Sequence, residues 1–384
     1  MDLRETDEQQ FLRRAVREFA ETEIRPNVMT WDEAQAFPKD LLPKLAALGL
    51  MGIQVPEALG GSGQSAVSYC ICIEELARVD PSIALSIAAH NGLAVAHLAY
   101  FGNEAQKAKF LKPLAEGTQL GAWALTEASS GSDAASMRTS ARRDGNDWVI
   151  SGAKQFITHG ALGDTMVVMA VTDREQGSRG ISAFIVSRGN PGLRAGKKEN
   201  KLGMRASDTS EVVFEDCRVS ASEVIGAPGE GFQQAMQVLD AGRIGIAALA
   251  VGLAQGAYEA ARRYSLERRA FGQRISEFQA IRWKIADMIT RIQAARLLTY
   301  RAAWMRDSKI ERTSLESSIA KLYASEIAVR VAEEGVQIHG GYGFVKDYPA
   351  EKYFRDVKLC TIGEGTSEIQ RLVIGRQLLG RLAP

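Results

Sequence analysis

The chain has 384 residues, with 47 Lys and Arg against 46 Asp and Glu and a formal net charge of +1. This length predicts two or three domains with a large core. The balanced charge argues against a general affinity for nucleic acid or an anionic membrane. The four cysteines and four histidines lack the spacing of a metal site, and we expect buried thiols in a reducing compartment.

Residues 1–121 are predicted to form an α-helical domain. The charged start leads at once into an amphipathic helix, with Phe11, Val16 and Phe19 at helical spacing. We recognise neither a signal peptide nor an apolar run of transmembrane length, so we expect a cytoplasmic protein without a membrane anchor. Further helices are predicted at 41–50, 65–79, 82–99 and 104–114.

Residues 122–226 are predicted to form an all-β domain. Short runs rich in Val, Ile and Phe are separated by Gly, Asn and Asp, and Asp144-Gly145 is a turn signal. The region lacks the glycine-rich strand-to-helix fingerprint of a Rossmann unit. The clearest strands are predicted at 147–150, 166–169, 182–186 and 211–214.

Residues 227–384 return to a helical pattern. Small residues line much of the first long helix, which would allow close packing in a four-helix bundle. The order helical, β, helical is unusual. The long helices are predicted at 232–263, 276–307, 315–335 and 368–379.

A carboxylate near the C-terminus, Glu364, stands between two glycines just before a strongly patterned helix. Thr366 and Ser367 are natural N-caps for that helix. Glu364 would therefore project from a loop at a helix N-terminus, where backbone N–H groups point outward. Such a loop can place a general base beside donors that polarise a carbonyl. A capped surface loop is the alternative interpretation.

Five further segments carry residues suited to ligand binding. Each also has an ordinary structural explanation, such as a Ser turn, core packing, or an i,i+3 ion pair between Asp240 and Arg243. The glycines of the last segment follow a helix rather than a strand, so a P-loop is not implied. The segments are 123–133, 152–160, 239–243, 267–272 with Gln279, and 337–343.

In this order, and with Glu364-Gly365-Thr366, the segments resemble the acyl-CoA dehydrogenase family over essentially the whole chain. The short-chain and short-branched-chain members are the most similar. The resemblance implies an α+β multidomain fold with an N-terminal helical domain (1–121), a central β-barrel (122–226) and a C-terminal four-helix bundle (227–384). It also implies bound FAD and a homotetramer arranged as a dimer of dimers.

The resemblance also implies the role of each site residue. Glu364 would be the catalytic base, and no metal would take part. The substrate would contact Ser132, Asp240, Arg243 and Gly365. FAD would contact Trp123, Leu125, Thr126, Ser132, Phe156, Ile157, Thr158, Arg268, Phe271, Gln279, Thr366 and Glu368, together with Gln337, Gly340 and Gly341 of a neighbouring subunit.

The implied reaction is α,β-dehydrogenation of a short, branched or cyclic acyl-CoA thioester to the trans-2-enoyl-CoA. Glu364 would remove the α-proton, flavin N5 would accept the β-hydride, and electrons would pass to electron-transfer flavoprotein. A carboxylate can do this only with a raised pKa and with donors on the thioester oxygen. Some family members place the base at the position of Gly242, which cannot act as one.

Two positions bear on the acyl group. Gly363 replaces a tyrosine that many relatives have before the base, which predicts extra room for an α-branched or cyclic group unless a neighbouring side chain fills the gap. Where glutaryl-CoA dehydrogenases carry an arginine, Ser82-Ile83-Ala84-Leu85 has no cation. That stretch predicts an apolar tail pocket and argues against a dicarboxylyl substrate.

Two alternatives remain on the same scaffold. An acyl-CoA oxidase would pass electrons to O2, although known oxidases often carry an extra C-terminal domain and this sequence ends at Pro384 without one. A non-catalytic CoA- or flavin-binding protein would have no need of Glu364. The sequence leaves the acyl group, the pathway and the electron acceptor open.

Overall fold

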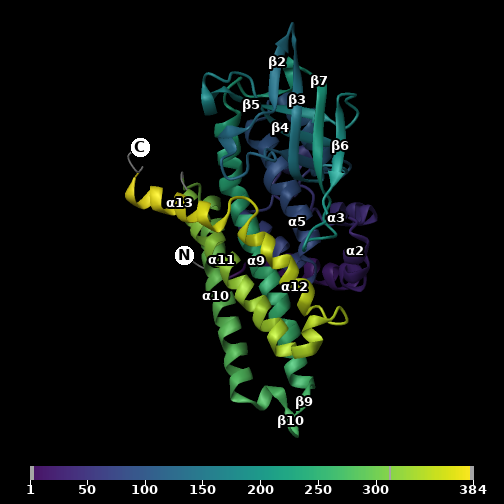
Figure 1. The fold of residues 1–384 in the computed structure, drawn as a ribbon, viewed down its shortest axis with the longest axis vertical. Helices are drawn as coiled ribbons and strands as arrows, with labels where there is room; N and C mark the ends of the chain where they lie inside the picture. The colour runs from purple at the N-terminus through teal and green to yellow at the C-terminus, as the bar shows by residue number, and fades with distance from the viewer. Residues whose placement is uncertain (1–3, 311–312, 381–384) are drawn as a thin grey trace.

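The chain folds into a helical N-terminal region, a central mixed sheet and a helical C-terminal region, which is the order helical, β, helical that the sequence predicts (Figure 1). The computed structural model describes residues 4–310 and 313–380. The sheet lies at one end of an elongated molecule, and the long C-terminal helices run to the other end.

The N-terminal helices are α1 to α8. A capping box between Thr6 and Gln9 starts the first of them. The predicted helix at 82–99 is two α-helices joined by a π-helical turn, His90–Val95. The eight helices are Asp7–Phe19 (α1), Val28–Ala34 (α2), Leu42–Ala47 (α3), Ala66–Val79 (α4), Pro81–Ala89 (α5), Ala96–Phe101 (α6), Glu104–Gln106 (α7) and Lys112–Ala115 (α8).

The central sheet has eight strands in the order β6-β7-β3-β2-β4-β5-β8, with β1 paired to β4 in parallel. All four strands predicted from the sequence are present, although each is longer than predicted. The strands are Gly121–Ala124 (β1), Ser140–Asp144 (β2), Asp147–Thr158 (β3), Thr165–Val171 (β4), Ile181–Ser187 (β5), Leu193–Lys198 (β6), Thr209–Ser220 (β7) and Val224–Ile225 (β8).

The sheet does not close into the barrel that was expected. Closure would require a ladder between the end strands β6 and β8, and the described residues form none. β8 has only two residues and leads almost directly into the first long C-terminal helix, while most of β6 is exposed. Too little of β8 is available to build the closing ladder.

Four long or medium helices and one short helix make up the C-terminal region. They are α9 (Gly231–Glu267), α10 (Gln279–Asp307), α11 (Ser314–His339), α12 (Ala350–Val357) and α13 (Ser367–Leu379). A two-stranded ribbon of β9 (Arg269–Ala270) and β10 (Gln273–Arg274) connects α9 to α10 at the end away from the sheet.

The core is centred on α9, which packs against α4, α5, α10 and α11. Close approach to α4 depends on two glycines, because a side chain at Gly252 would overlap the carbonyl oxygen of Glu74 and one at Gly256 that of Arg78. Two stretches, Pro81–Phe101 and Gly231–Glu267, are long and apolar enough to cross a membrane, contrary to the sequence expectation. In the structure 89% and 72% of their apolar windows are buried, which is the position of core helices.

Candidate active site

The Glu364 loop lies between a short 3-10 turn, Lys358–Thr361, and the start of α13. The Thr366 side chain accepts a hydrogen bond from the Ile369 N–H at 3.3 Å, which confirms Thr366 as the N-cap. Ser367 is instead the first helical residue. Glu364 itself has a φ of 53°, in the left-handed region that non-glycine residues rarely occupy. The surrounding structure must therefore hold this loop in place.

Two side chains hold the Glu364 loop in place through hydrogen bonds to its backbone. The ammonium of Lys321, on α11, is fully buried and donates to the carbonyl oxygen of Gly365 at 2.7 Å. The Gln370 amide donates to the same oxygen at 2.9 Å and to the carbonyl oxygen of Glu364 at 3.2 Å. Neither residue was singled out from the sequence, because each is identified only by the contact it makes in the fold.

The Glu364 carboxylate is turned into the protein. Its Oε2 is buried and has no hydrogen-bond partner among the described residues. It faces Gly242 of α9 so closely that a Cβ there would overlap Oε2 and would reach 3.3 Å from the Leu93 side chain. Burial raises the pKa of Glu364 to about 7, although the charges of Lys321 and Arg243 pull it down. The result is a carboxylate that can accept a proton near neutral pH.

Three of the predicted substrate residues come together around this carboxylate. Gly365 follows Glu364 in the loop, and Asp240 and Arg243 lie on α9. The Arg243 guanidinium donates to Asp240, which also accepts from the hydroxyl of Ser314. Arg243 Nε is buried without a partner among the described residues. Ser132, the fourth predicted residue, is exposed in the loop after β1.

A second group of predicted residues lies at the sheet. Trp123, Leu125 and Ile157 are buried, whereas Thr126 and Thr158 are half-buried. A bulge interrupts the pairing of β3 with β7 between Lys154 and Ile157. At this bulge Phe156 takes a φ of 59° and is 61% exposed, while the Gln155 N–H donates to the backbone carbonyl oxygen of Thr126 at 2.8 Å. The bulge thus presents an exposed aromatic ring next to a residue that is hydrogen-bonded to the Thr126 backbone.

Buried polar side chains that the sequence did not reveal fix this second group. The Trp123 indole donates to His97, whose other nitrogen contacts the amide oxygen of Gln234. Lys154 is fully buried and donates to the carbonyl oxygen of Leu125 at 2.9 Å and to Glu127 at 2.8 Å. Burial lowers the pKa of Lys154 to about 8, although the negative charge of Glu127 raises it in part. Buried side chains therefore anchor the segment that leads from β1 to Thr126.

The predicted dinucleotide contacts form a third group, far from the other two. Arg268, Gly340 and Gly341 line one pocket of about 610 Å³. Its aromatic wall includes Tyr264 and Tyr342, and the Arg268 guanidinium lies 5.5 Å from the Tyr342 ring. The remaining predicted residues near this end, Phe271, Gln279 and Gln337, are exposed and do not line the pocket.

One chain does not bring all the predicted cofactor residues together. Thr366 and Glu368 stand with Glu364 at the start of α13, but Arg268 ends α9 at the far end of the molecule. A helix rises about 1.5 Å per residue, so the stretch of α9 from Arg243 to Arg268 spans roughly 40 Å. The third group therefore cannot share a small ligand with the other two groups of the same chain.

Comparison with known proteins identifies the class to which this fold and site belong. Residues 6–118, 122–217 and 229–379 match the N-terminal, middle and C-terminal domains of acyl-CoA dehydrogenases. The short-chain specific acyl-CoA dehydrogenase of Clostridium acetobutylicum is 44% identical over 98% of this chain and 100% of its own. The chain therefore belongs to the acyl-CoA dehydrogenase family, and is an FAD-dependent oxidoreductase.

Two further relatives are similarly close. The solved structure of butyryl-CoA dehydrogenase from Megasphaera elsdenii has a TM-score of 0.97 and 42% identity, covering 99% of this chain and 100% of its own. The caffeyl-CoA reductase-Etf complex subunit CarC of Acetobacterium woodii is 43% identical over 97% of this chain and 99% of its own.

Proposed function

We propose that this protein oxidises the α,β-bond of a short acyl-CoA thioester, with Glu364 as the base that removes the α-proton. The observation that carries this proposal is the buried Oε2 of Glu364, which has no hydrogen-bond partner in the described part of the chain, and the pKa of this carboxyl is raised to about 7. A carboxylate with that pKa is a much better proton acceptor than an exposed one, and remains substantially ionised at neutral pH. The short-chain and butyryl-CoA relatives support a short acyl group.

The surroundings of Glu364 suit the charge that develops on the substrate. Removing the α-proton moves negative charge toward the thioester oxygen, which donors and positive charge stabilise. The N-terminus of α13 begins next to the loop and carries a partial positive charge. Arg243 adds a buried cation whose Nε–H has no partner within residues 4–310 and 313–380. We propose that these groups face the thioester while Oε2 faces the α-carbon.

The residues present fit FAD. Phe156 is held outward by the bulge beside Thr126, and we propose that both contact the flavin ring. Arg268 and the backbone at Gly340 and Gly341 offer the donors that a pyrophosphate needs. When bound, FAD supplies the acceptor for the hydride that leaves the β-carbon.

We propose that a neighbouring copy completes this cofactor site, in the predicted tetramer arranged as a dimer of dimers. Since the two sets of contacts are roughly 40 Å apart along α9, the flavin and adenine ends must be held by different chains. α10 also exposes large apolar side chains at positions related by multiples of seven, as expected for a helix interface. They are Trp283, Leu297 and Trp304, which are 62%, 51% and 38% exposed.

The electron acceptor is proposed to be an electron-transfer flavoprotein, because the similar CarC protein is named as a subunit of an Etf complex. The oxidase alternative predicts something different. After reduction by substrate, an oxidase would be reoxidised by air within its turnover time, whereas a dehydrogenase would need the flavoprotein or an artificial acceptor. Stopped-flow reoxidation distinguishes the two.

Glu364→Gln tests the proposed base. The variant should still bind FAD, yet bleaching of the flavin by butyryl-CoA without oxygen should slow by ~10²–10⁴-fold, the usual contribution of general-base catalysis. Glu333→Gln, an exposed carboxylate on α11, is the matched control and should react like the parent protein. Retention of more than about a tenth of the activity in Glu364→Gln would exclude Glu364 as the base.

Gly363 supports the proposal that the acyl group can be α-branched or cyclic. The three atoms nearest to a Cβ at Gly363 would all belong to Leu359, at 3.6–3.7 Å, so a side chain would fit there and its absence leaves room. We expect 2-methyl-branched and cyclic acyl-CoAs to be turned over at least as well as butyryl-CoA. In Gly363→Tyr, butyryl-CoA should instead be preferred over the branched and cyclic thioesters, by roughly tenfold in kcat/KM. A clash or the loss of one or two methylene contacts in a pocket has about that effect. A clear preference of the parent protein for straight chains would contradict the idea.

A further inference from the structure

Three of the four histidines of the chain hold strand β1 through hydrogen bonds. Among the described residues, β4 is the only strand that pairs with β1. His90 accepts from the N–H of Gly121 at 3.0 Å, and His159 contacts the carbonyl oxygen of the same residue at 2.9 Å. His97 accepts from the indole N–H of Trp123 at 3.1 Å. These three side chains therefore clamp the strand that leads into the proposed flavin contacts.

The partners of His90 fix its protonation state. A backbone N–H can only donate, so Nδ1 of His90, which accepts from Gly121, carries no proton. Nε2 lies 2.9 Å from the carbonyl oxygen of Met51 and 3.2 Å from that of Leu114, and it carries the proton because carbonyl oxygens can only accept. A second proton on Nδ1 would set two N–H groups against each other and would break the bond to Gly121.

His97 and His159 are held neutral in related ways. Nδ1 of His97 accepts from Trp123, so its proton is on Nε2, which lies 3.0 Å from the amide oxygen of Gln234. His159 donates from Nδ1 to Gly121, and its buried Nε2 has no partner among the described residues. Protonation of His97 would break its bond to β1, and protonation of His159 would create a buried N–H without an acceptor, which is costly.

The charges that face the three rings leave the neutral form favoured. His90 faces His159, and the carboxylate that faces His159 is Asp208. Burial lowers the pKa of His90 and that of His97 to about 4. Burial also lowers the pKa of His159, although the bond to Gly121 and the charge of Asp208 oppose the shift. The clamped strand therefore stabilises all three histidines without charge.

Other charged side chains near β1 are engaged with backbone or with each other. Asp164 accepts from the backbone N–H just before β1, and Arg188 donates to two carbonyl oxygens of the loop after β3. Glu127 is paired with Lys154. Burial raises the pKa of Glu127, but the charge of Lys154 outweighs this and holds that pKa below its usual range. Glu127 thus keeps its charge down to a pH at which free histidines are already protonated.

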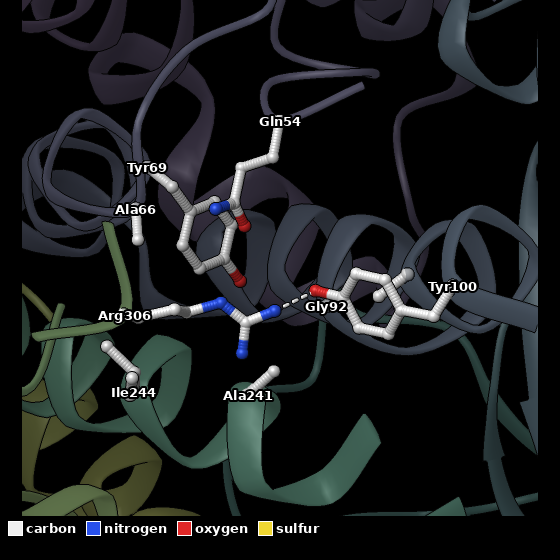
Figure 2. A pocket seen from close by; sticks show the side chains of 9 residues that line it. Gln54, Ala66, Tyr69, Gly92, Tyr100, Ala241, Ile244 and Arg306 are labelled. Carbon is white, nitrogen blue, oxygen red and sulfur yellow. Dashed lines mark hydrogen bonds between the residues drawn. The ribbon is translucent and has the colours of Figure 1, made fainter. Parts of the chain in front are cut away.

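The π-helical turn that carries His90 has little room to move away from β1. A Cβ on Gly121 would lie 3.3 Å from Nδ1 of His90, so the turn and the strand are in close contact. Gly92, two residues further along the turn, lines a pocket of about 10 Å³, roughly the room of one water molecule. Figure 2 shows Gly92 at this pocket together with the side chains of Tyr100 and Arg306. Well-packed side chains therefore keep His90 against the strand.

We propose that His90, His97 and His159 are positioning residues that hold β1 only while they are neutral, so that mild acid frees β1 and releases FAD. The inference rests on the proposed flavin contacts of the proposed function and adds a pH-dependent control of cofactor retention. A histidine freed from the clamp has an ordinary pKa of about 6.5. Below that pH the freed strand takes up protons that the clamped strand excludes, so the clamp loses stability as the pH falls from about 6.5 toward 4.

The size of the effect follows from the two pKa values of each ring. Between pH 7 and pH 5, a fall in pKa from 6.5 to about 4 favours opening by roughly 20–30-fold for each of His90 and His97. Together they favour opening by about 10²–10³-fold, and His159 adds to this in the same direction.

Hydrogen exchange of the FAD-loaded protein measures the clamp directly. Protection of the amides of residues 121–124, corrected for the intrinsic effect of pH on exchange, is compared at pH 7 and pH 5 with that of residues 320–332 in α11. Protection of β1 should fall by about 10²–10³-fold more than that of α11. The affinity for FAD, followed by flavin fluorescence in the same buffers, should weaken by at least about tenfold, and a return to pH 7 should restore both.

His90→Asn and His97→Asn keep a side-chain oxygen that can accept from β1 but cannot take up the proton. Each substitution should reduce the fall in β1 protection by about 20–30-fold. His339→Asn is the matched control and should leave that fall unchanged. His339 is also buried, but it contacts the carbonyl oxygen of Gly335 at 2.7 Å and stacks on the ring of Tyr264 instead of binding β1.

Equal changes in β1 and α11 between the two pH values would overturn the clamp, as would a fall in β1 protection at constant FAD affinity. A fall that persists in full in both asparagine variants would also overturn it. If neither variant folds, the parent protein decides, because uptake of two or three protons should make β1 protection fall by more than about tenfold between pH 6 and pH 5. Failure of the proposed function is distinct: no acyl-CoA would bleach the flavin, while the release of β1 by acid would be unaffected.

Discussion

The two ends of α9 carry two different kinds of site. Near Asp240 and Arg243 the helix borders an enclosed carboxylate, that of Glu364. Lys321 and Gln370 hold its loop through the backbone carbonyl oxygens, and among the described residues Oε2 has no hydrogen-bond partner. Near Arg268 the helix borders an open pocket of about 610 Å³. The first site raises the pKa of Glu364. The second offers an exposed cation, Arg268, together with the exposed ring of Tyr342 and exposed glycine backbone.

This difference follows from what each end has to do. Proton abstraction requires a desolvated base, and desolvation is achieved only where one chain packs around it. Binding the polar end of a dinucleotide requires accessible donors, which a neighbouring chain can then cover. At the enclosed end, a substitution that adds even one atom should therefore lower the rate of proton abstraction. At the open end, a substitution should weaken FAD binding without changing that rate.

Gly242→Ala is expected to have the largest effect of the variants that separate the two ends. The added Cβ would overlap Glu364 Oε2 and come within 3.3 Å of Leu93, so the base must move. A displacement of about 1 Å at a reacting group can cost ~10²-fold in rate. Turnover of butyryl-CoA should fall by that order while bound FAD remains. Gly375→Ala, on α13 with no atom within 4 Å of the new Cβ, is the control. Equal turnover in the two variants would show that the enclosed site tolerates repacking.

Arg268→Gln should affect the open end of α9, and should change FAD affinity rather than turnover. Loss of one charged donor to a pyrophosphate is expected to weaken FAD binding by about 10–100-fold. With FAD in excess, kcat and its dependence on pH should be close to those of the parent protein. Arg269→Gln, the neighbouring exposed residue of β9, controls for loss of charge. Fluorescence titration of the apoprotein measures the affinity, and an unchanged value would remove Arg268 from the cofactor site.

At the enclosed end, the sequence predicts which local segments form the site better than it predicts which side chains surround them. The long periodic helices and the Thr366 cap are local features, and the structure has them within a few residues of the prediction. Glu364 could be singled out because a carboxylate between glycines before a helix is visible in ten residues. β3, in contrast, was predicted only over 147–150 because its second half is polar and bulged, so the alternation of a strand is lost.

The contacts that give the site its chemistry are not local. Lys321, Arg243 and Gln370 come from three separate helices, and only packing brings the first two to the Glu364 loop. Failure of the barrel to close is also a property of the whole sheet, decided by how little of β8 remains before α9 begins.

Lys321→Met gives the smallest and most specific effect, a shift in pH dependence at the enclosed end alone. The Lys321 charge lowers the pKa of Glu364, so removing it should raise that pKa above about 7. The base must be ionised to react, and the acid limb of kcat/KM should therefore move to higher pH, by up to about one unit, or tenfold in rate at pH 6.

The two profiles should converge above about pH 9, for two reasons. Glu364 is then ionised in both proteins, and Lys321 itself loses its proton there, because burial lowers its pKa to about 8 despite the opposing charges of Cys360 and Glu364. Gln370 still donates to the Gly365 carbonyl oxygen at 2.9 Å, so the loop keeps a second support in the variant. Lys358→Met, which removes an exposed charge nearby, should leave the limb in place. A profile lowered equally at every pH would mean that Lys321 positions the loop without setting the basicity of Glu364.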